Sequence, residues 1–310
     1  MEKMETVIQA GSRSFEKLLE AHAQWLGDES DGKRCVLQGE TLNEAKLSGA
    51  NLREAVLRGT VLLDAELSGA NLSGAILVET DFGRAMLSGA DLNGAEISDC
   101  NFMFTWLTEA VLSEATLRNT ILRKANLRDA RLQDATIEGC KFGGAILNNA
   151  SFHHARIASC DFCDSEFMTT QFMRVQMLNC RFVAANGARA NFSNSRIKSC
   201  DFAKADLSGA KFFQTDFNGS QLDRAILSYA DLRDAQLNGI MLGRADLVGA
   251  NLQDANLFAA DLRGANLTGA RRLTSHQLCQ ARTDETTILP NGSRGPYRRS
   301  SGAERPVATS

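Results

Sequence analysis

Proline is nearly absent from this sequence: three occur in 310 residues, at Pro290, Pro296 and Pro306. Proline has no backbone N–H and interrupts hydrogen-bonded ladders, so the chain before residue 290 keeps a backbone donor at every position. No run of eighteen apolar residues occurs, and no membrane-spanning helix is predicted. Residues 1–11 lack the basic start and the apolar stretch of a secretory signal, which favours the cytoplasm.

Patterns that carry catalysis or bind cofactors are also missing. The four histidines are His22, the adjacent His153 and His154, and His276. No Ser/His/Asp, Cys/His or paired-carboxylate arrangement can be placed on one face. There is no phosphate-binding loop and no dinucleotide fingerprint. We therefore expect neither an enzyme nor a cofactor nor a metal site.

A spacing of five residues dominates what is present. Leu, Phe, Ile or Met stands at every fifth position from Leu37 to Leu267, and among 47 consecutive positions only Gly187 departs from the rule. The residue two places earlier is small in nearly every case. This period fits neither a helix, which repeats at about 3.6 residues, nor a strand, which repeats at about 2. The chain must turn a corner every five residues.

A second period of twenty indicates four corners per turn. Phenylalanines recur at multiples of twenty in two sets that are ten residues out of step, so like residues should stack in columns that face each other across a coil. The sets are Phe82, Phe102, Phe142, Phe162, Phe182 and Phe202, and Phe152, Phe172, Phe192 and Phe212. The apolar centre and the small residue of each pentapeptide then face inward. At roughly 4.8 Å per coil, this gives about twelve coils.

The repeated Ala-(Asp/Asn)-Leu-x-x pattern, seen in Ala50-Asn51-Leu52 and Thr80-Asp81-Phe82, resembles that of pentapeptide-repeat proteins. The resemblance covers residues 35–270. It implies an all-β solenoid, a right-handed quadrilateral β-helix. It implies no single function, because a fold does not fix a function and members of this family have diverse roles.

The ends of a solenoid expose unpaired strand edges, so we expect a cap at each end. Residues 1–34 are expected to form the N-terminal cap, with an amphipathic helix over residues 14–27. Its apolar face follows helical spacing and consists of Phe15, Leu18, Leu19, His22, Trp25 and Leu26. A helix that binds a partner or a membrane surface is the alternative interpretation.

Residues 271–290 are expected to form the C-terminal cap. Thr274 and Gln277 match a capping box, which predicts a short helix whose Leu278 closes the last coil. Residues 291–310 are rich in Gly, Ser, Pro and Arg, and we expect them to form a disordered tail.

Six of the eight cysteines occupy the small inward-facing position, and we interpret them as slightly larger alanines in a reducing compartment. Cys160 and Cys163 also form a C-x-x-C, which is the spacing of redox and metal pairs. The repeat, however, directs Cys160 inward and Cys163 outward. The six inward cysteines are Cys35, Cys100, Cys140, Cys160, Cys180 and Cys200.

Gly187 removes an inward side chain from a column that contains Phe167 and Leu207. A void there would be costly. Two outcomes are open: a neighbouring ring fills the space, or the coil bends locally.

Charge is divided unevenly along the repeat. Residues 35–115 carry 4 basic and 12 acidic residues, residues 116–200 carry 12 and 6, and residues 201–270 carry 6 and 9. Some pentapeptide-repeat proteins imitate duplex DNA and bind DNA gyrase, and the resemblance keeps gyrase as the alternative partner. A basic middle third and a capped C-terminal end argue against it. Direct nucleic-acid binding is not expected, because basic residues such as Arg118 and Arg131 run around the coil.

One outward cluster of large apolar residues predicts a partner surface. Trp106 precedes the centre Leu107, and Met103 and Phe104 follow the centre Phe102, so all three should face outward. Exposed aromatic residues are enriched at interface hot spots. Met86, one coil below Trp106, and Leu63, two coils below Met103, extend the cluster. The plainer alternative is that Met103 and Phe104 only wrap a corner.

We therefore interpret the chain as a non-enzymatic bacterial scaffold whose rigid, rod-like surface binds a protein. Two alternatives remain: a modulator of DNA gyrase or topoisomerase of the quinolone-tolerance type, and a secreted bacterial effector of the same fold. The sequence does not identify the partner, the biological process or the oligomeric state.

Overall fold

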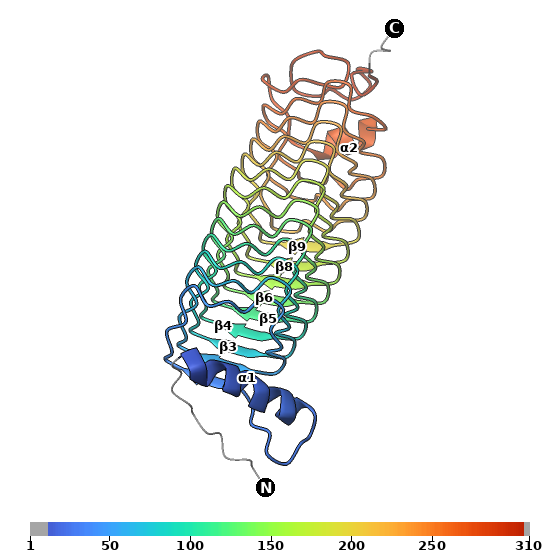
Figure 1. Ribbon diagram of the computed structural model, residues 1–310. Helices are drawn as coiled ribbons and strands as arrows, with labels where there is room; N and C mark the ends of the chain where they lie inside the picture. Colours follow the sequence, from blue (N-terminus) through green and yellow to red (C-terminus); the bar gives the residue numbers. More distant parts are fainter. Residues whose placement is uncertain (1–11, 307–310) are drawn as a thin grey trace. The chain divides into compact units, whose positions relative to one another are not determined.

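The computed structural model describes residues 12–306, and the chain divides into two compact units between Ile146 and Leu147. In each unit the backbone winds through stacked coils made of short segments (Figure 1). Over the described residues, no helix is long and apolar enough to cross a membrane.

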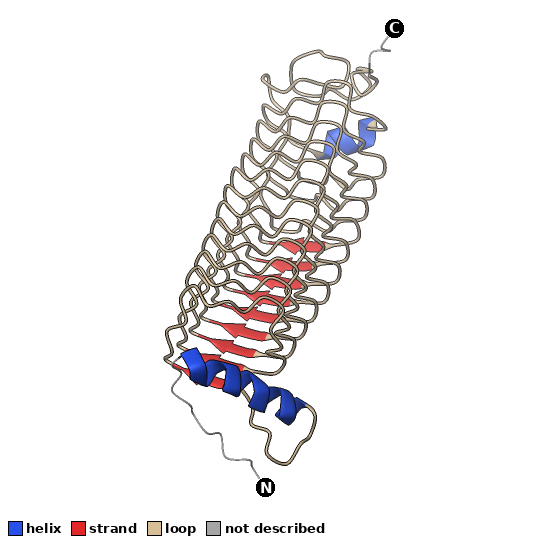
Figure 2. Cartoon of the chain, in the orientation of Figure 1, coloured by secondary structure: helices blue, strands red, loops and turns tan. Residues whose placement is uncertain are grey.

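The first unit consists of one helix followed by coils in strict register. Each strand pairs in parallel with the strand twenty residues later, as Leu37 does with Leu57. The other three sides repeat the same shift through isolated bridges such as Thr41↔Val61. Strands therefore occupy one side of the coil and loops the others (Figure 2). The elements are α1 (Ser12–Leu26), β1 (Val36–Gln38), β2 (Val56–Arg58), β3 (Ile76–Val78), β4 (Glu96–Ser98), β5 (Thr116–Arg118) and β6 (Thr136–Glu138).

The second unit repeats this architecture and ends in a short helix. Its strands pair in parallel with the same shift, as Ile157 does with Met177. Beyond the third strand, the same side continues through isolated bridges such as Arg196↔Asp216. The elements are β7 (Arg156–Ala158), β8 (Gln176–Leu178), β9 (Arg196–Lys198) and α2 (Ser275–Gln280).

The five-residue period is explained by a repeated turn. The residue two places after the centre has a positive φ, as Glu44 does at 57°, and the N–H of Ala45 donates to the carbonyl of Leu42. This is a type II turn. The Asp or Asn before the centre supports it: Asn71 Oδ1 accepts the backbone N–H of Ser73 at 3.0 Å. The Asp/Asn of the repeat therefore holds the corner in place.

The interior consists of the apolar centres and the small residues that precede them. Ala65 and Leu67 are fully buried, for example. Phenylalanine rings stack in columns in both units, with centroids 4.7 Å apart for Phe82 and Phe102 and 4.6 Å apart for Phe162 and Phe182. The predicted fold class, an all-β solenoid of four-sided pentapeptide coils, is confirmed.

The space at Gly187 is filled by a neighbouring ring. A Cβ on Gly187 would lie 1.8 Å from Cε2 of Phe167. The Phe167 ring itself is fully buried and meets Phe182 edge-on, with centroids 5.4 Å apart. Of the two outcomes left open by the sequence, the structure therefore adopts the first.

The expected N-terminal helix is present as α1, and His22 joins it to the first coils. His22 is fully buried. Its Nδ1 accepts the backbone N–H of Cys35 at 3.0 Å, and its Nε2 lies 2.9 Å from the carbonyl oxygen of Arg53. The imidazole stacks on Trp25, with ring centroids 5.6 Å apart. One side chain thus satisfies two backbone groups at the open end of the coils. The side chain of Phe15 lies outside the described residues.

The C-terminal helix α2 carries a side chain with a comparable role. Thr274 and Gln277 form the predicted capping box. The Gln277 amide nitrogen also donates to the carbonyls of Leu252 and Ala255, each at 2.8 Å. Leu278 is buried beside it. The cap therefore supplies a side-chain donor to two backbone carbonyls near the end of the coils.

The expectation of a disordered tail from residue 291 is wrong for residues 291–306. Ile288 and Arg294 form an antiparallel bridge. Tyr297 donates its hydroxyl proton to one of two acceptors within reach, Ser275 Oγ at 2.7 Å or a carboxylate oxygen of Glu304 at 2.9 Å. The composition of the tail concealed these contacts, because one tyrosine anchors a segment that is otherwise polar. Residues 307–310 lie outside the described residues.

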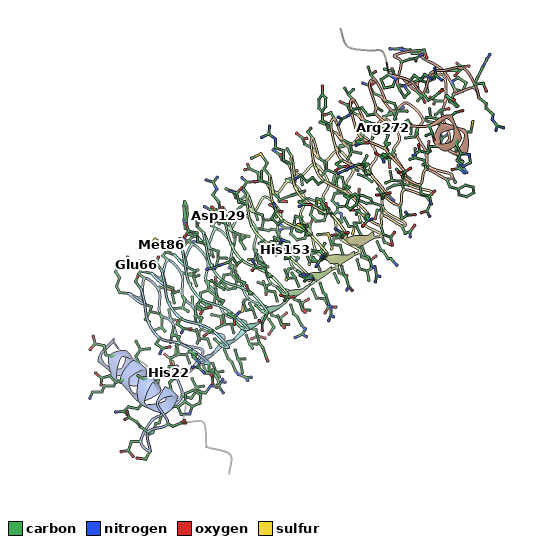
Figure 3. The ribbon with its side chains drawn as sticks, turned by 90° about the vertical axis from the view of Figure 1, so that its right-hand side faces the viewer. His22, Glu66, Met86, Asp129, His153 and Arg272 are labelled. Carbon is green, nitrogen blue, oxygen red and sulfur yellow. The ribbon has the colours of Figure 1, made fainter. Side chains whose placement is uncertain are left out.

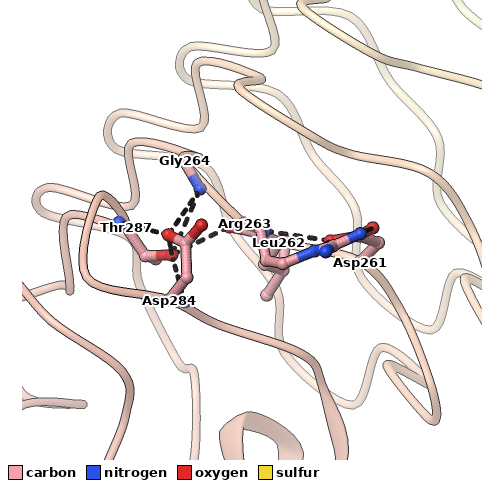
Figure 4. A network of polar contacts seen from close by, with 6 residues as sticks. All are labelled: Asp261, Leu262, Arg263, Gly264, Asp284 and Thr287. Carbon is pink, nitrogen blue, oxygen red and sulfur yellow. Dashed lines mark hydrogen bonds and ion pairs between the residues drawn. The ribbon is translucent and has the colours of Figure 1, made fainter.

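Asp284 fastens the chain after α2 to the last coil (Figure 4). Its Oδ1 accepts the backbone N–H groups of Gly264, Thr286 and Thr287, at 3.1, 2.9 and 3.1 Å. Hydrogen bonds from the Thr286 hydroxyl, from the amides of Thr286 and Gly264 and from the Thr287 hydroxyl lower the pKa of the Asp284 carboxyl to about 2. The network therefore favours the charged carboxylate.

We expect Asp284→Ala to destabilise the C-terminal cap by about 1 kcal/mol, the usual cost of losing a capping carboxylate. The pKa of Asp284 is lowered on folding, so its contribution is complete above about pH 3.9, the unfolded value, and is lost as the pH falls toward the folded value. Hydrogen exchange at the Gly264 and Thr287 amides measures this. Glu285→Ala, which removes the adjacent exposed carboxylate, is the matched control. Equal protection in both variants would contradict the assignment.

The inward cysteines are all buried and all eight cysteines are free. Burial raises the pKa of the Cys35 thiol to about 12. Cys160 is buried and Cys163 is half-exposed, as the repeat predicts. No group of His, Cys, Asp and Glu suited to a metal ion occurs within residues 12–306.

Candidate protein-binding surface

The predicted cluster lies in the first unit, and the name Trp106 patch is used below for Leu63, Met86, Met103, Phe104 and Trp106. Met86 and Trp106 are neighbours in one column, because they form a parallel bridge. Their exposed fractions are 41% and 54%. Glu66, the next residue down that column, lies beside Met86 on the outside of the coil (Figure 3).

Phe104 stands at a corner, where most repeats place a polar residue or glycine. Its φ is 60°, and its side chain is 47% exposed. A left-handed conformation costs a residue other than glycine roughly 1–2 kcal/mol. The ammonium of Lys124 lies 5.5 Å from the ring centroid. An exposed cation–π contact of this kind stabilises by only about 0.5–1 kcal/mol. The ring therefore adds little to the stability of the free chain.

Leu63 and Met103 complete the patch and are both half-buried. A Cβ on Gly83, the residue between them in the column, would come within 3.0 Å of Cδ2 of Leu63. The absence of a side chain at Gly83 thus lets Leu63 cover it. Met103 is thus less exposed than Phe104, and the alternative that both residues only wrap a corner stays open.

Charged pairs border the patch. Arg84, next to Phe104 in its column, donates to both carboxylate oxygens of Asp64, at 2.8 and 2.6 Å. These hydrogen bonds lower the pKa of Asp64. Lys46 pairs with Glu66 on the adjacent side. An apolar centre with a charged rim is the usual anatomy of a protein interface.

The second unit also carries exposed apolar residues, which were not predicted from the sequence. Tyr229 is the most exposed, at 66%, and it borders a groove of about 570 Å³ together with Met168, Arg189 and Gly209. Tyr229 stands two places after the centre Leu227, so the rule that found Phe104 would also have found it. The others are Leu178, Ile226, Met241 and Phe258.

A scan against protein families matched the model of pentapeptide repeats, with eight copies on residues 35–74, 65–103, 107–144, 130–167, 205–243 and 236–271. One copy of the family model spans close to forty residues, as 35–74 does, whereas one coil spans roughly twenty. The number of copies, eight, therefore differs from the expected number of coils, about twelve. The comparison with curated proteins gave no match.

Solved structures of the same family resemble the chain. HetL, a protein involved in heterocyst differentiation regulation in the cyanobacterium Nostoc sp. strain PCC 7120, is 25% identical over 81% of this chain and 94% of its own, with a TM-score of 0.36. A pentapeptide repeat protein of the Arabidopsis thaliana thylakoid lumen is 27% identical over 33% and 70%, with a TM-score of 0.26. QnrB1, a plasmid-mediated fluoroquinolone resistance protein, is 17% identical over 77% and 84%, with a TM-score of 0.17. The model of pentapeptide repeats matches more than half of the residues of this chain, and the chain therefore belongs to the pentapeptide-repeat family.

Proposed function

We propose that this chain is a non-enzymatic scaffold of the bacterial cytoplasm whose Trp106 patch binds a protein partner. The observation that carries the proposal is the exposure of Met86 and Trp106 side by side, together with that of Phe104 two residues before Trp106, on a surface whose other outward residues are mostly polar. Tryptophan at the centre of an apolar patch is the residue most enriched at binding hot spots.

The backbone beneath the patch is fixed before any partner arrives. The N–H of Trp106 donates to the carbonyl of Ala85 at 3.0 Å, and its own carbonyl accepts the N–H of Leu87 at 2.7 Å. A partner therefore meets side chains on an ordered frame, and the entropy cost of association is reduced.

Gyrase modulation is kept as the second candidate function, because QnrB1 is a fluoroquinolone resistance protein of the same family. Two features of this chain argue against it. The C-terminal end of the coils is closed by Gln277 and Leu278, and residues 116–200 are basic rather than DNA-like. A secreted effector of the same fold is the third candidate, and no observation favours it over the first.

Trp106→Ala is expected to weaken partner binding about 30-fold, the effect of losing a hot spot worth about 2 kcal/mol. The side chain is half-exposed, so its removal should leave thermal unfolding nearly unchanged. Affinity capture from the native cell with the intact chain identifies the partner, and a titration with the purified partner measures the change in Kd.

Phe258→Ala is the matched control, since Phe258 is also an exposed aromatic residue but belongs to the second unit. Equal partner affinity for Trp106→Ala and Phe258→Ala would refute the patch. Capture of gyrase subunits, followed by relief of a fluoroquinolone in a supercoiling assay, would favour the second candidate function instead.

A further inference from the structure

The outward face of β7, β8 and β9 carries three cations and no anion. Arg156 and Arg196 stand in one row and Lys198 in the other, and all three are exposed. No carboxylate occurs on these three strands, and the corner residues that follow them, Ser159, Asn179 and Ser199, are uncharged. This set of strands is called the basic face below.

The cations of the basic face have no ion-pair partner among residues 12–306, in contrast with arginines elsewhere in the same unit. Arg233 pairs with Asp231 at 2.7 Å, and Arg263 pairs with Asp261 at 2.6 Å. In those pairs, the carboxylate stands just before the centre of the pentapeptide and the arginine just after it. On β9 both of these positions are basic, so no such pair can form within this pentapeptide, and Asp216, the next residue in the row of Arg196, forms no ion pair with it.

An apolar hollow lies between the cations. Leu178 on β8 is 47% exposed, and Ala158 beside it is too short to fill the space. The hollow measures about 320 Å³, and its rim includes Arg156, Arg196 and Lys198. Because adjacent coils lie about 4.8 Å apart, the backbones at Arg156 and Arg196 are roughly 10 Å apart. The apolar floor of Ala158 and Leu178 thus lies beside a row in which Gln176 separates Arg156 from Arg196, and Lys198 ends the floor's own row.

We propose that the basic face is a second binding site, distinct from the Trp106 patch, for an acidic peptide segment in which an apolar side chain is flanked by carboxylates. The apolar side chain enters the hollow over Leu178 and Ala158. The flanking carboxylates pair with Arg156 on one side and with Arg196 and Lys198 on the other. Arginine can engage a carboxylate through two parallel N–H donors, which adds specificity to the attraction.

A peptide fits this face better than a nucleic acid. Single-stranded nucleic acids are bound through aromatic side chains that stack on the bases, and the outward residues of β7, β8 and β9 include none. Phosphate contacts alone would also leave the hollow at Leu178 empty. The order of cation, apolar floor and cation matches a sequence of acidic, apolar and acidic residues.

Fluorescence anisotropy of a labelled synthetic peptide, with one leucine between two pairs of glutamates, tests the proposal on the full chain. Saturable binding that weakens steeply as NaCl is raised is expected. Arg196→Glu together with Lys198→Glu should weaken the binding at least tenfold. Leu178→Ser should weaken the leucine peptide several-fold and leave unchanged a peptide with alanine in its place.

Arg224→Glu together with Arg244→Glu is the matched control, because it reverses the same number of exposed charges elsewhere in the same unit. Trp106→Ala should also bind the peptide normally, which separates this site from the proposed function. Equal loss in the control pair, or no effect of Leu178→Ser, would overturn the proposal. A single-stranded oligonucleotide of equal charge that binds more tightly than the peptide would overturn it as well.

Discussion

Gly187→Leu is expected to destabilise the second unit, although leucine is the residue that the repeat places most often at this position. A Cβ on Gly187 would lie 1.8 Å from Cε2 and 2.3 Å from Cζ of Phe167. The Phe167 ring cannot move aside, because it packs edge-on against Phe172 and Phe192. Inserting extra methylene groups into a packed core typically costs up to about 3 kcal/mol. A leucine side chain adds several carbon atoms at once, so we expect a cost of at least about this size.

The same geometry predicts a rescue. Phe167→Leu alone removes the part of the ring that occupies the space at Gly187, and the resulting cavity should cost about 2 kcal/mol. Phe167→Leu combined with Gly187→Leu restores two ordinary centres on adjacent coils. The double variant should therefore be more stable than Gly187→Leu alone, with a coupling energy of about 2–3 kcal/mol.

Urea unfolding followed by circular dichroism measures the midpoints for the four proteins of this cycle. Repeat proteins unfold as a sum of local units, so hydrogen exchange at the amides of Gly187 and Ala190 serves as the local readout. An unfolding midpoint of Gly187→Leu equal to that of the unaltered chain would show that the coil adapts at little cost. A double variant no better than Gly187→Leu would show that Phe167 is not the residue in conflict.

The sequence predicted the coils because the repeat is a local rule that each pentapeptide obeys by itself. The Asp or Asn before a centre and the positive φ after it form one corner without reference to distant residues, as Asn71 and Ser73 do. The ring that fills Gly187 could not be predicted in this way. Phe167 reaches that space from the adjacent coil, and its path depends on the rings around it rather than on the spacing of five.

For the candidate site, the sequence placed the residues but did not determine their degree of exposure. The rule that assigns outward positions located Met86 and Trp106 in one column and Phe104 in another. It could not show that Leu63 covers Gly83, because that depends on a side-chain conformation. It treated His22 as part of an apolar face, whereas the structure shows it bound to two backbone groups at the end of the coils.

His22→Leu is expected to release α1 from the first coils. Leucine fills a similar volume but offers neither an acceptor to the N–H of Cys35 nor a donor to the carbonyl of Arg53. A buried polar group left without a partner costs about 1–3 kcal/mol. His22→Leu leaves two such groups without a partner, the N–H of Cys35 and the carbonyl of Arg53. The free energy that holds α1 in place should therefore fall by about 3 kcal/mol or more.

Acid should produce the same release in the unaltered chain. Nδ1 accepts the proton of the Cys35 N–H, so the imidazole must be neutral, with its own proton on Nε2 facing Arg53. Burial lowers the pKa of His22, and the charge of Arg34 lowers it further, whereas the carbonyl of Arg53 and the carboxylate of Glu54 oppose the shift. A lowered folded pKa means that the contribution of His22 is complete above about pH 6.5, the unfolded value, and is lost as the pH falls below it.

Hydrogen exchange of the Cys35 amide between pH 7.5 and pH 5, corrected for its intrinsic rate, should therefore show protection that declines with acid. His22→Leu should begin with low protection and stay flat over the same range. Removing the charge of Arg34, which also stands over Trp25 at 5.6 Å, with Arg34→Gln should make the acid-induced loss of protection smaller, because one cause of the lowered folded pKa is gone while the unfolded value, where the loss begins, is unchanged. Protection independent of pH in the unaltered chain would show that α1 is held by its apolar face, with Leu18 as the buried residue, rather than by His22.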